Sequence, residues 1–285
     1  MDEFGKRPAR RRVYDGVMKG LVLLGAGLTI ALLVALIGYI LVRGLPHVTW
    51  QLLSTSPSMM KGTIGILPNI LNTLYLILFT LLISLPLGVG AAVYLTEYAK
   101  NRRFAEMVEF ATETLAGIPS ILYGLVGMLF FCQMLGFKTS LLSGGCTLVV
   151  MILPTIIRTT QESLKTVPQS YREGALALGA GKWHMVRTVV LPGAVDGIVT
   201  GCILAIGRIV GESAALLYTA GFGMALVSLF DSLHTSSATL TVALYVYATE
   251  GGETALAFSI ATILMVLTLL INLTAGIIGR KLKRK

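Results

Sequence analysis

Six long apolar runs dominate this chain and leave few folds open to it. A helix needs about 20 apolar residues to span the hydrocarbon core of a bilayer. Segments of roughly that length are residues 20–42, 73–93, 114–137, 139–157, 197–219 and 254–279. Only 13% of the residues are charged, which is about half the share in a soluble domain. We therefore expect an all-α integral membrane protein with six transmembrane helices.

The first apolar run is predicted to be a retained transmembrane helix. Residues 20–42 contain no charge over 23 positions, whereas the apolar core of a signal peptide is about 7–15 residues long. No small-residue cleavage pattern follows, since the next residues are Arg43-Gly44-Leu45-Pro46. We expect residues 43–69 to form an extracytoplasmic loop and residues 70–279 to form the main transmembrane domain.

The positions of lysine and arginine predict the topology. With a cytoplasmic N-terminus, 19 of the 23 basic residues fall in cytoplasmic pieces, three fall outside and Arg208 lies within a span. The basic tail (1–19) and the basic end (280–285) hold eleven of them. Because cytoplasmic loops carry the excess of lysine and arginine, both termini are predicted to be cytoplasmic. The net charge of +9 is thus a topology signal and not a sign of nucleic-acid binding.

The predicted outer connection, residues 220–253, is long yet apolar. It contains runs such as 224–230 and 240–247, but neither reaches 18 uninterrupted apolar residues. A seventh crossing is therefore excluded by length. We expect a short helix or re-entrant piece packed against the mouth of the bundle.

One motif lies in the longest cytoplasmic connection, residues 158–193. It reads E-[AG]-A-x3-G-x9-[IV]-x-L-P, and its fixed positions include Glu173, Gly174, Ala175, Gly179, Leu191 and Pro192. The spacing resembles the coupling loop of the membrane subunits of binding-protein-dependent ABC importers, which docks on a separate ATPase. An ordinary capped cytoplasmic helix is the alternative interpretation.

Residues around this motif predict a helix of two or three turns. Ser170 is a candidate N-cap with Glu173 as its capping-box partner, and Gly179 and Gly181 are candidate stops. The small residues Gly174 and Ala175 would leave its surface open to the close approach of a partner.

ATP hydrolysis is not expected in this chain. A phosphate-binding loop requires G-x4-G-K-[ST], and the nearest stretch, 176–183, has leucine at the first glycine and tryptophan after the lysine. The three cysteines fall inside apolar runs without metal-ligand spacing, and no nucleophile has a visible base partner. We predict a transport subunit without cofactor or metal, and not an enzyme.

Two charged residues in the fifth apolar run are the candidate substrate site. Arg208 lies at its centre and Glu212 four residues later, a spacing that places both on one face of a helix. An arginine at the bilayer centre costs about 2.5–3.5 kcal/mol on insertion scales. One interpretation is a self-neutralising ion pair. The other is an anion station, in which the guanidinium binds an oxyanion and the carboxylate selects protonated phosphate over sulfate.

With these residues in view, the chain resembles the phosphate-specific ABC importer permeases of the PstA type. The resemblance rests on the coupling motif, on 118–121 with Gly124, on 153–160, on 207–219 and on 240–242 with Tyr245. It implies a type I ABC importer permease fold and alternating access driven by ATP. It also implies a heterodimer with a PstC-type permease, two copies of a PstB-type ATPase and a PstS-type phosphate-binding protein. The implied substrate-path residues are Arg208, Glu212, Ser213 and Arg158.

In this family a proline is frequent at position 215, where this chain has alanine, and the resemblance therefore leaves a helix break at that position open. Other functions also stay open. The chain could serve an importer of another oxyanion such as molybdate, sulfate or phosphonate, or a homodimeric pore. A membrane scaffold for phosphate sensing is an alternative from another class. In every case we expect a multi-pass protein of a bacterial or archaeal cytoplasmic membrane.

Overall fold

The computed structural model describes residues 9–57, 64–249 and 252–283, and this part of the chain is helical without a strand. The long helices are α1 (Ala9–Gly44), α3 (Leu67–Val93), α6 (Leu141–Thr166) and α14 (Thr254–Lys283). The others are α2 (Trp50–Ser54), α4 (Arg102–Ala116), α5 (Ser120–Gly127), α7 (Gln169–Ala177), α8 (Lys182–Met185), α9 (Leu191–Gly193), α10 (Val195–Gly211), α11 (Ala214–Thr219), α12 (Leu229–His234) and α13 (Leu240–Thr249). A 3-10 turn, η1 (Leu45–His47), and π-helical segments η2 (Tyr94–Tyr98), η3 (Met128–Met134) and η4 (Val186–Val190) complete them.

The predicted all-α membrane fold is confirmed, with two of the six spans bent. Among the described residues, four helices are long and apolar enough to cross a membrane, including one over Thr254–Gly279 that matches the predicted last span. Two bent pairs bring the number to six if each pair is one span. Parts of the predicted segments lie outside the described residues. These are 1–8 of the basic tail, 58–63 of the loop over 43–69, 250–251 of the connection over 220–253, and 284–285 of the basic end.

The predicted span over 114–137 is not a continuous helix. The helix α4 ends at Ala116, and α5 begins at Ser120 after a bend of 100°. Pro119 explains the break, because proline removes a backbone donor and disfavours helical backbone at the residue before it. The helix α4 starts at Arg102, within the predicted cytoplasmic connection, so part of that connection is helical.

The fifth predicted span, 197–219, is also interrupted. The helix α10 ends at Gly211, Glu212 takes an extended backbone (φ −82, ψ 118) and α11 starts at Ala214. The break that the resemblance left open therefore exists in this chain without a proline at position 215.

The core lies where α3, α6 and α10 pack together. Its fully buried side chains include Leu76, Leu148, Ile152 and Ile209. Gly197 and Gly201 stand one turn apart on α10, where added Cβ atoms would overlap Ser163 and Thr159 of α6. Small residues at this spacing allow close helix approach in membranes, and they fix the register of α10 on α6.

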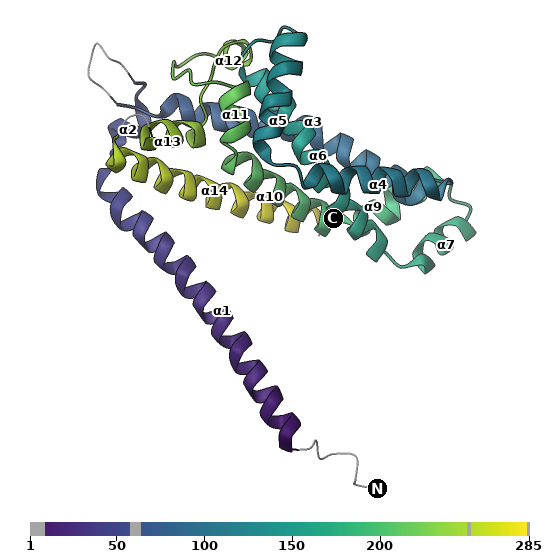
Figure 1. Cartoon of the computed structure of the whole chain (residues 1–285). Helices are drawn as coiled ribbons and strands as arrows, with labels where there is room; N and C mark the ends of the chain where they lie inside the picture. Colours follow the sequence, from purple (N-terminus) through teal and green to yellow (C-terminus); the bar gives the residue numbers. More distant parts are fainter. Residues whose placement is uncertain (1–8, 58–63, 250–251, 284–285) are drawn as a thin grey trace.

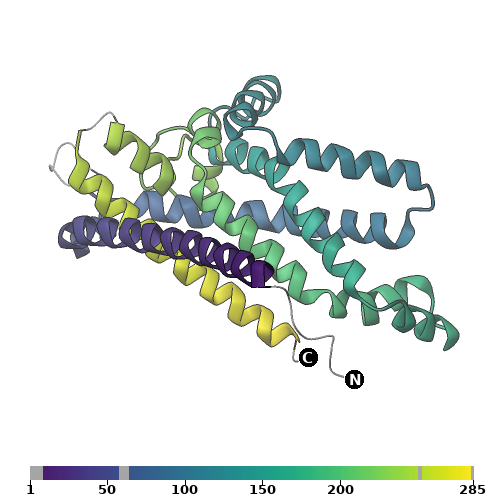
Figure 2. The same ribbon diagram turned by 60° about the horizontal axis from the view of Figure 1, so that its bottom comes forward.

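The predicted packed piece in the outer connection is confirmed. Helices α12 and α13 lie at the end of the bundle opposite α7 (Figures 1 and 2). The side chains of Asn69 and Asn72 on α3 donate to the Ala238 carbonyl at 3.1 and 3.2 Å. Thr73 Oγ1 accepts from the Leu240 backbone N–H at 2.9 Å. These bonds hold α13 on the start of α3.

In contrast, α1 leaves the bundle. Figure 1 shows it running diagonally away from the other helices, and none of the membrane-length window within Tyr14–His47 is buried. Its contacts gather at its C-terminal end, where Tyr39 packs edge-on against Phe258 and Ser259 Oγ donates to the Gly44 carbonyl at 3.3 Å. A Cβ at Gly44 would overlap the Phe258 carbonyl, so glycine permits this crossing.

Substituting Gly197 with alanine should separate α10 from α6 and lower stability. The added Cβ meets Ser163 Cβ, which cannot rotate away, and overpacking of this kind costs about 1–3 kcal/mol. The matched control is Gly207→Ala on the same helix, where nothing lies within 4 Å of an added Cβ. Thermal unfolding in detergent should show a lower midpoint for Gly197→Ala only. Equal midpoints for the two variants would contradict the close packing.

Candidate functional site

The first candidate site is the motif over residues 173–192, which the structure places on α7, on the turn after it and on α9. The helix α6 continues to Thr166, so the first part of the predicted loop, from Arg158 on, is helical. The nine residues of α7 give the expected length of two to three turns. Gly179 has φ +83 just after the helix, which confirms the predicted glycine stop.

The predicted capping of α7 is wrong. Pro168, and not Ser170, is the N-cap residue, and no side chain caps the helix. The proline ring has no polar atom that could accept from the first backbone N–H groups, so the helix starts here without a side-chain cap. Gly181 likewise serves as the N-cap of α8 and not as a second stop.

The motif divides into an exposed half and a packed half. Glu173, Gly174 and Gly179 are exposed and Ala175 is half-buried. Nothing lies within 4 Å of a Cβ built at Gly174, and Glu173 makes no hydrogen bond or ion pair with any described residue. Leu191, the first residue of the short α9, packs in contrast against a buried apolar cluster, while the next residue, Pro192, stays exposed.

A surface this open suits docking of another protein. Two large apolar side chains beside the motif, Tyr171 (62% exposed) and Leu178 (90% exposed), face solvent at the same place. Exposed apolar residues around a rigid small-residue helix are typical of a protein interface.

The second candidate site, Arg208 with Glu212, differs from the prediction. Glu212 is the C-cap residue that ends α10, its carboxylate points to the following turn, and it forms no ion pair with Arg208. Glu212 is 8% exposed, its Oε1 accepts from the Ala215 N–H at 3.0 Å, and its carbonyl accepts from Thr241 Oγ1 at 3.1 Å. Its carboxylate therefore holds the start of α11.

Arg208 stays without a charged partner. Its side chain is half-buried on α10, it makes no hydrogen bond or ion pair with a described residue, and Tyr123 of α5 lies within electrostatic reach. Ser213 is half-buried at the start of α11, and its side chain makes no capping bond. A guanidinium left free inside a membrane protein is available to an anion.

Arg158 lies elsewhere, on the surface where α4 meets α6. Its side chain is 61% exposed and pairs with Glu113 at 3.3 Å and Glu162 at 3.1 Å. The register set by Gly201 on Thr159 places Arg208 about two turns farther along the antiparallel helix. The structure therefore does not bring the two arginines together.

One pair that the sequence did not predict is Glu97 with Arg172. Arg172 Nη2 lies 2.8 Å from Glu97 Oε1, and the two side chains are only 10% and 7% exposed. The available signals were an acid directly after the apolar run of α3 and an arginine directly before Glu173. Neither signal predicts that residues 75 positions apart meet.

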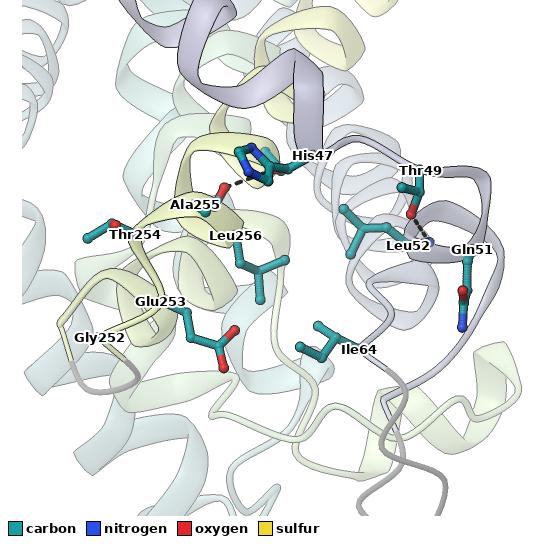
Figure 3. A pocket seen from close by; sticks show the side chains of 11 residues that line it. His47, Thr49, Gln51, Leu52, Ile64, Gly252, Glu253, Thr254, Ala255 and Leu256 are labelled. Atoms are coloured by element: carbon teal, nitrogen blue, oxygen red, sulfur yellow. Dashed lines mark hydrogen bonds between the residues drawn. The ribbon is translucent and has the colours of Figure 1, made fainter.

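The cavity in Figure 3 lies away from both candidate sites. Its volume is about 570 Å³, with residues 47–52 on one wall and the start of α14 on the other (Figure 3). It contains none of the predicted site residues, so it carries no argument about the substrate.

Comparison with known proteins supports the membrane-transport interpretation. Residues 84–284 match the family described as binding-protein-dependent transport system inner membrane component. The chain is 38% identical over 211 residues to the probable ABC transporter permease protein YqgI of Bacillus subtilis, covering 74% of this chain and 72% of that protein. It is 34% identical over 263 residues to the phosphate transport system permease protein PstA of Xylella fastidiosa strain Temecula1, covering 88% and 90%.

Solved structures agree on the fold. A chain of the bacterial alginate ABC transporter, in complex with its alginate-bound periplasmic protein, gives a TM-score of 0.70 at 14% identity. That match covers 98% of this chain and 99% of the other. A chain of the MetNI methionine ABC transporter in an inward-facing conformation gives 0.59 at 22% identity, covering 76% and 94%.

We expect Glu212→Ala to destabilise the chain more than Glu212→Gln. Alanine removes the acceptor for the Ala215 N–H, and loss of a cap costs about 0.5–2 kcal/mol. Glutamine keeps an acceptor oxygen of the same reach. Thermal unfolding of the two purified variants measures the difference. A glutamine variant as unstable as the alanine variant would show that the charge, and not the cap, holds the break.

Proposed function

Because the chain belongs to the family of inner membrane components of binding-protein-dependent transport systems, and within it to the PstA-type permeases, we propose that it is the permease subunit of an ATP-driven phosphate importer. As such it is a multi-pass protein of the cytoplasmic membrane and a transport component, not an enzyme. Substrate would cross by alternating access, with the ATP hydrolysed on a separate chain.

The observation that carries the proposed substrate is the free guanidinium of Arg208. An arginine inside a membrane span is costly unless it has a partner, and the described residues offer it none. An oxyanion in transit would supply that partner, with paired acceptors that match the planar donors. Phosphate is the oxyanion named for the PstA relatives, to which this chain is similar over most of its length.

The role of Glu212 changes accordingly. A selector role would require the Glu212 carboxylate to face the anion beside Arg208, whereas its Oε1 accepts from the Ala215 N–H. We assign Glu212 to holding the bend that follows α10, and Ser213, whose side chain makes no capping bond, stays a candidate on the substrate path. Arg158 remains a weaker candidate at the inner end of the path, since Glu113 and Glu162 already neutralise it.

The exposed half of the motif is proposed to dock the ATPase. Glu173, Gly174, Ala175 and Gly179 would form the contact surface. Leu191 would hold the returning chain against the bundle, and the exposed Pro192 would lie beside it. This assignment requires α7 in the cytoplasm, and the excess of basic residues on the same side supports it. Both termini would then be cytoplasmic as well.

The complete importer would contain more chains. Membership of the family implies an ATPase and a substrate-binding protein. We further propose a heterodimeric pore with a PstC-type permease, two copies of a PstB-type ATPase and a PstS-type phosphate-binding protein.

Replacing Arg208 with alanine should abolish most phosphate uptake. Loss of a charge-assisted contact of about 1.5–3 kcal/mol corresponds to a fall of about tenfold or more. ATP-dependent uptake of radiolabelled phosphate into vesicles that hold all four subunits measures it, with Arg102→Ala (92% exposed side chain) as the control. A larger loss of phosphate uptake in Arg158→Ala than in Arg208→Ala would place the anion-binding site on α6 instead. Undiminished uptake in Arg208→Ala would reopen the identity of the substrate.

Replacing Glu173 with alanine should weaken assembly with the ATPase. Its exposed carboxylate has no partner among the described residues, and loss of a charged contact across an interface lowers affinity by about tenfold or more. Co-purification of the ATPase at a series of salt concentrations measures the change. Glu106→Ala, which removes an exposed acid from α4, is the control. Unchanged binding in Glu173→Ala would remove this residue from the docking surface.

A further inference from the structure

A single buried arginine joins three elements at the cytoplasmic end of the bundle. Arg172 of α7 donates from Nε and Nη2 to Glu97 Oε1 at 3.0 and 2.8 Å. Its Nη2 also donates to the Leu164 carbonyl at 2.8 Å, and its Nη1 donates to the Val167 carbonyl. Every nitrogen of the guanidinium is therefore engaged.

The partners belong to two different transmembrane helices. Glu97 lies in η2, the π-helical extension of α3. Leu164 lies in the last turn of α6, and Val167 is the residue that follows the helix. Carbonyls at a helix end have no partner within the helix, so Arg172 also satisfies the end of α6.

Burial makes this connection different from the other ion pairs of the described residues. The Arg172 and Glu97 side chains are 10% and 7% exposed, whereas those of Arg102 and Glu106 are 92% and 58% exposed at the same N–O distance of 2.8 Å. Water and salt weaken the exposed pair. They reach the buried pair much less, so its geometry is held firmly.

Arg172 precedes Glu173, the residue proposed to face the ATPase. Successive residues of a helix point about 100° apart, and the structure follows this rule, since Arg172 is buried and Glu173 is exposed. One side of α7 is thus fixed to the bundle while the other is open to a partner.

An apolar layer surrounds the connection. Val93 and Leu95 at the end of α3, Leu164 of α6 and Val186 of η4 belong to one buried cluster. Apolar contacts are not directional, so they allow small sliding movements. The forked guanidinium with acceptors on two elements fixes direction as well as distance.

From these contacts we infer that the Arg172–Glu97 pair is the joint that transmits displacement of α7 to α3 and α6. Arg172 is a positioning residue, because it touches neither ATP nor substrate. The inference rests on the proposed function, since it requires an ATPase that moves α7. It assigns roles to two residues outside the E-G-A-x3-G motif.

The first test separates transmission from docking. In the complete importer, Glu97→Gln keeps the shape of the side chain but removes its charge, and Arg172→Lys keeps the charge but removes the fork. Each should lower uptake about tenfold while ATP hydrolysis of the assembled complex stays within about twofold of wild type. The control is Glu106→Gln at the exposed pair, which should change neither rate. The transmitting role of the Arg172–Glu97 pair would be contradicted by unchanged uptake, by a parallel fall of uptake and ATP hydrolysis, or by loss of assembly.

The second test does not depend on the substrate. Spin labels at the exposed positions Lys100, just after η2, and Ser170 of α7 report the distance between the two elements. Each label is attached to a cysteine introduced at one of these two positions, after the native Cys132, Cys146 and Cys202 have been replaced. With the ATPase bound, ATP should leave this distance unchanged in the otherwise wild-type chain and should change or broaden it in Glu97→Gln. A distance that shifts with ATP in the wild-type chain would overturn the joint, even if the importer carries an anion other than phosphate.

Discussion

A helix that breaks inside a bilayer must satisfy its freed backbone groups within the protein, and this requirement shapes the centre of the molecule. No water is present in the hydrocarbon core to replace a lost hydrogen bond. At the end of α10 the solution is local, because Glu212 accepts from the Ala215 N–H through its side chain and from Thr241 through its carbonyl. The bend between α10 and α11 therefore depends on a carboxylate and on a residue of α13.

Much of the fold could be predicted because the hydropathy of a segment depends only on its own residues. The bounds of the last span followed from its apolar run, and so did the packed piece in 220–253. The two interruptions could not be found in the same way, because apolar residues continue on both sides of each break. Pro119 offered a signal for the first break, whereas the polar Glu212 and Ser213 at the second are equally compatible with a charged site on an unbroken helix.

The candidate sites show the same limit. The motif positions on α7 were predictable because they are local, and the structure places them at the surface as expected. Partners distant in sequence were not predictable. Arg158, Arg172 and Arg208 are the same residue type, yet one is paired at an exposed surface, one is buried with a carboxylate and two carbonyls, and one has no charged partner. Only the tertiary arrangement distinguishes them.

Because α1 is held at the crossing near Gly44, a small change of angle there produces a large displacement of its other end. A helix of 36 residues is about 54 Å long, and its contacts with the bundle lie at one end. A rotation of about 10° at that end moves the other end by about 9 Å, from the same rise per residue. The tilt of α1 in the membrane is therefore determined less by its own sequence than by the molecules that surround the rest of the helix. A bulky side chain at position 44 would change that tilt for the whole helix.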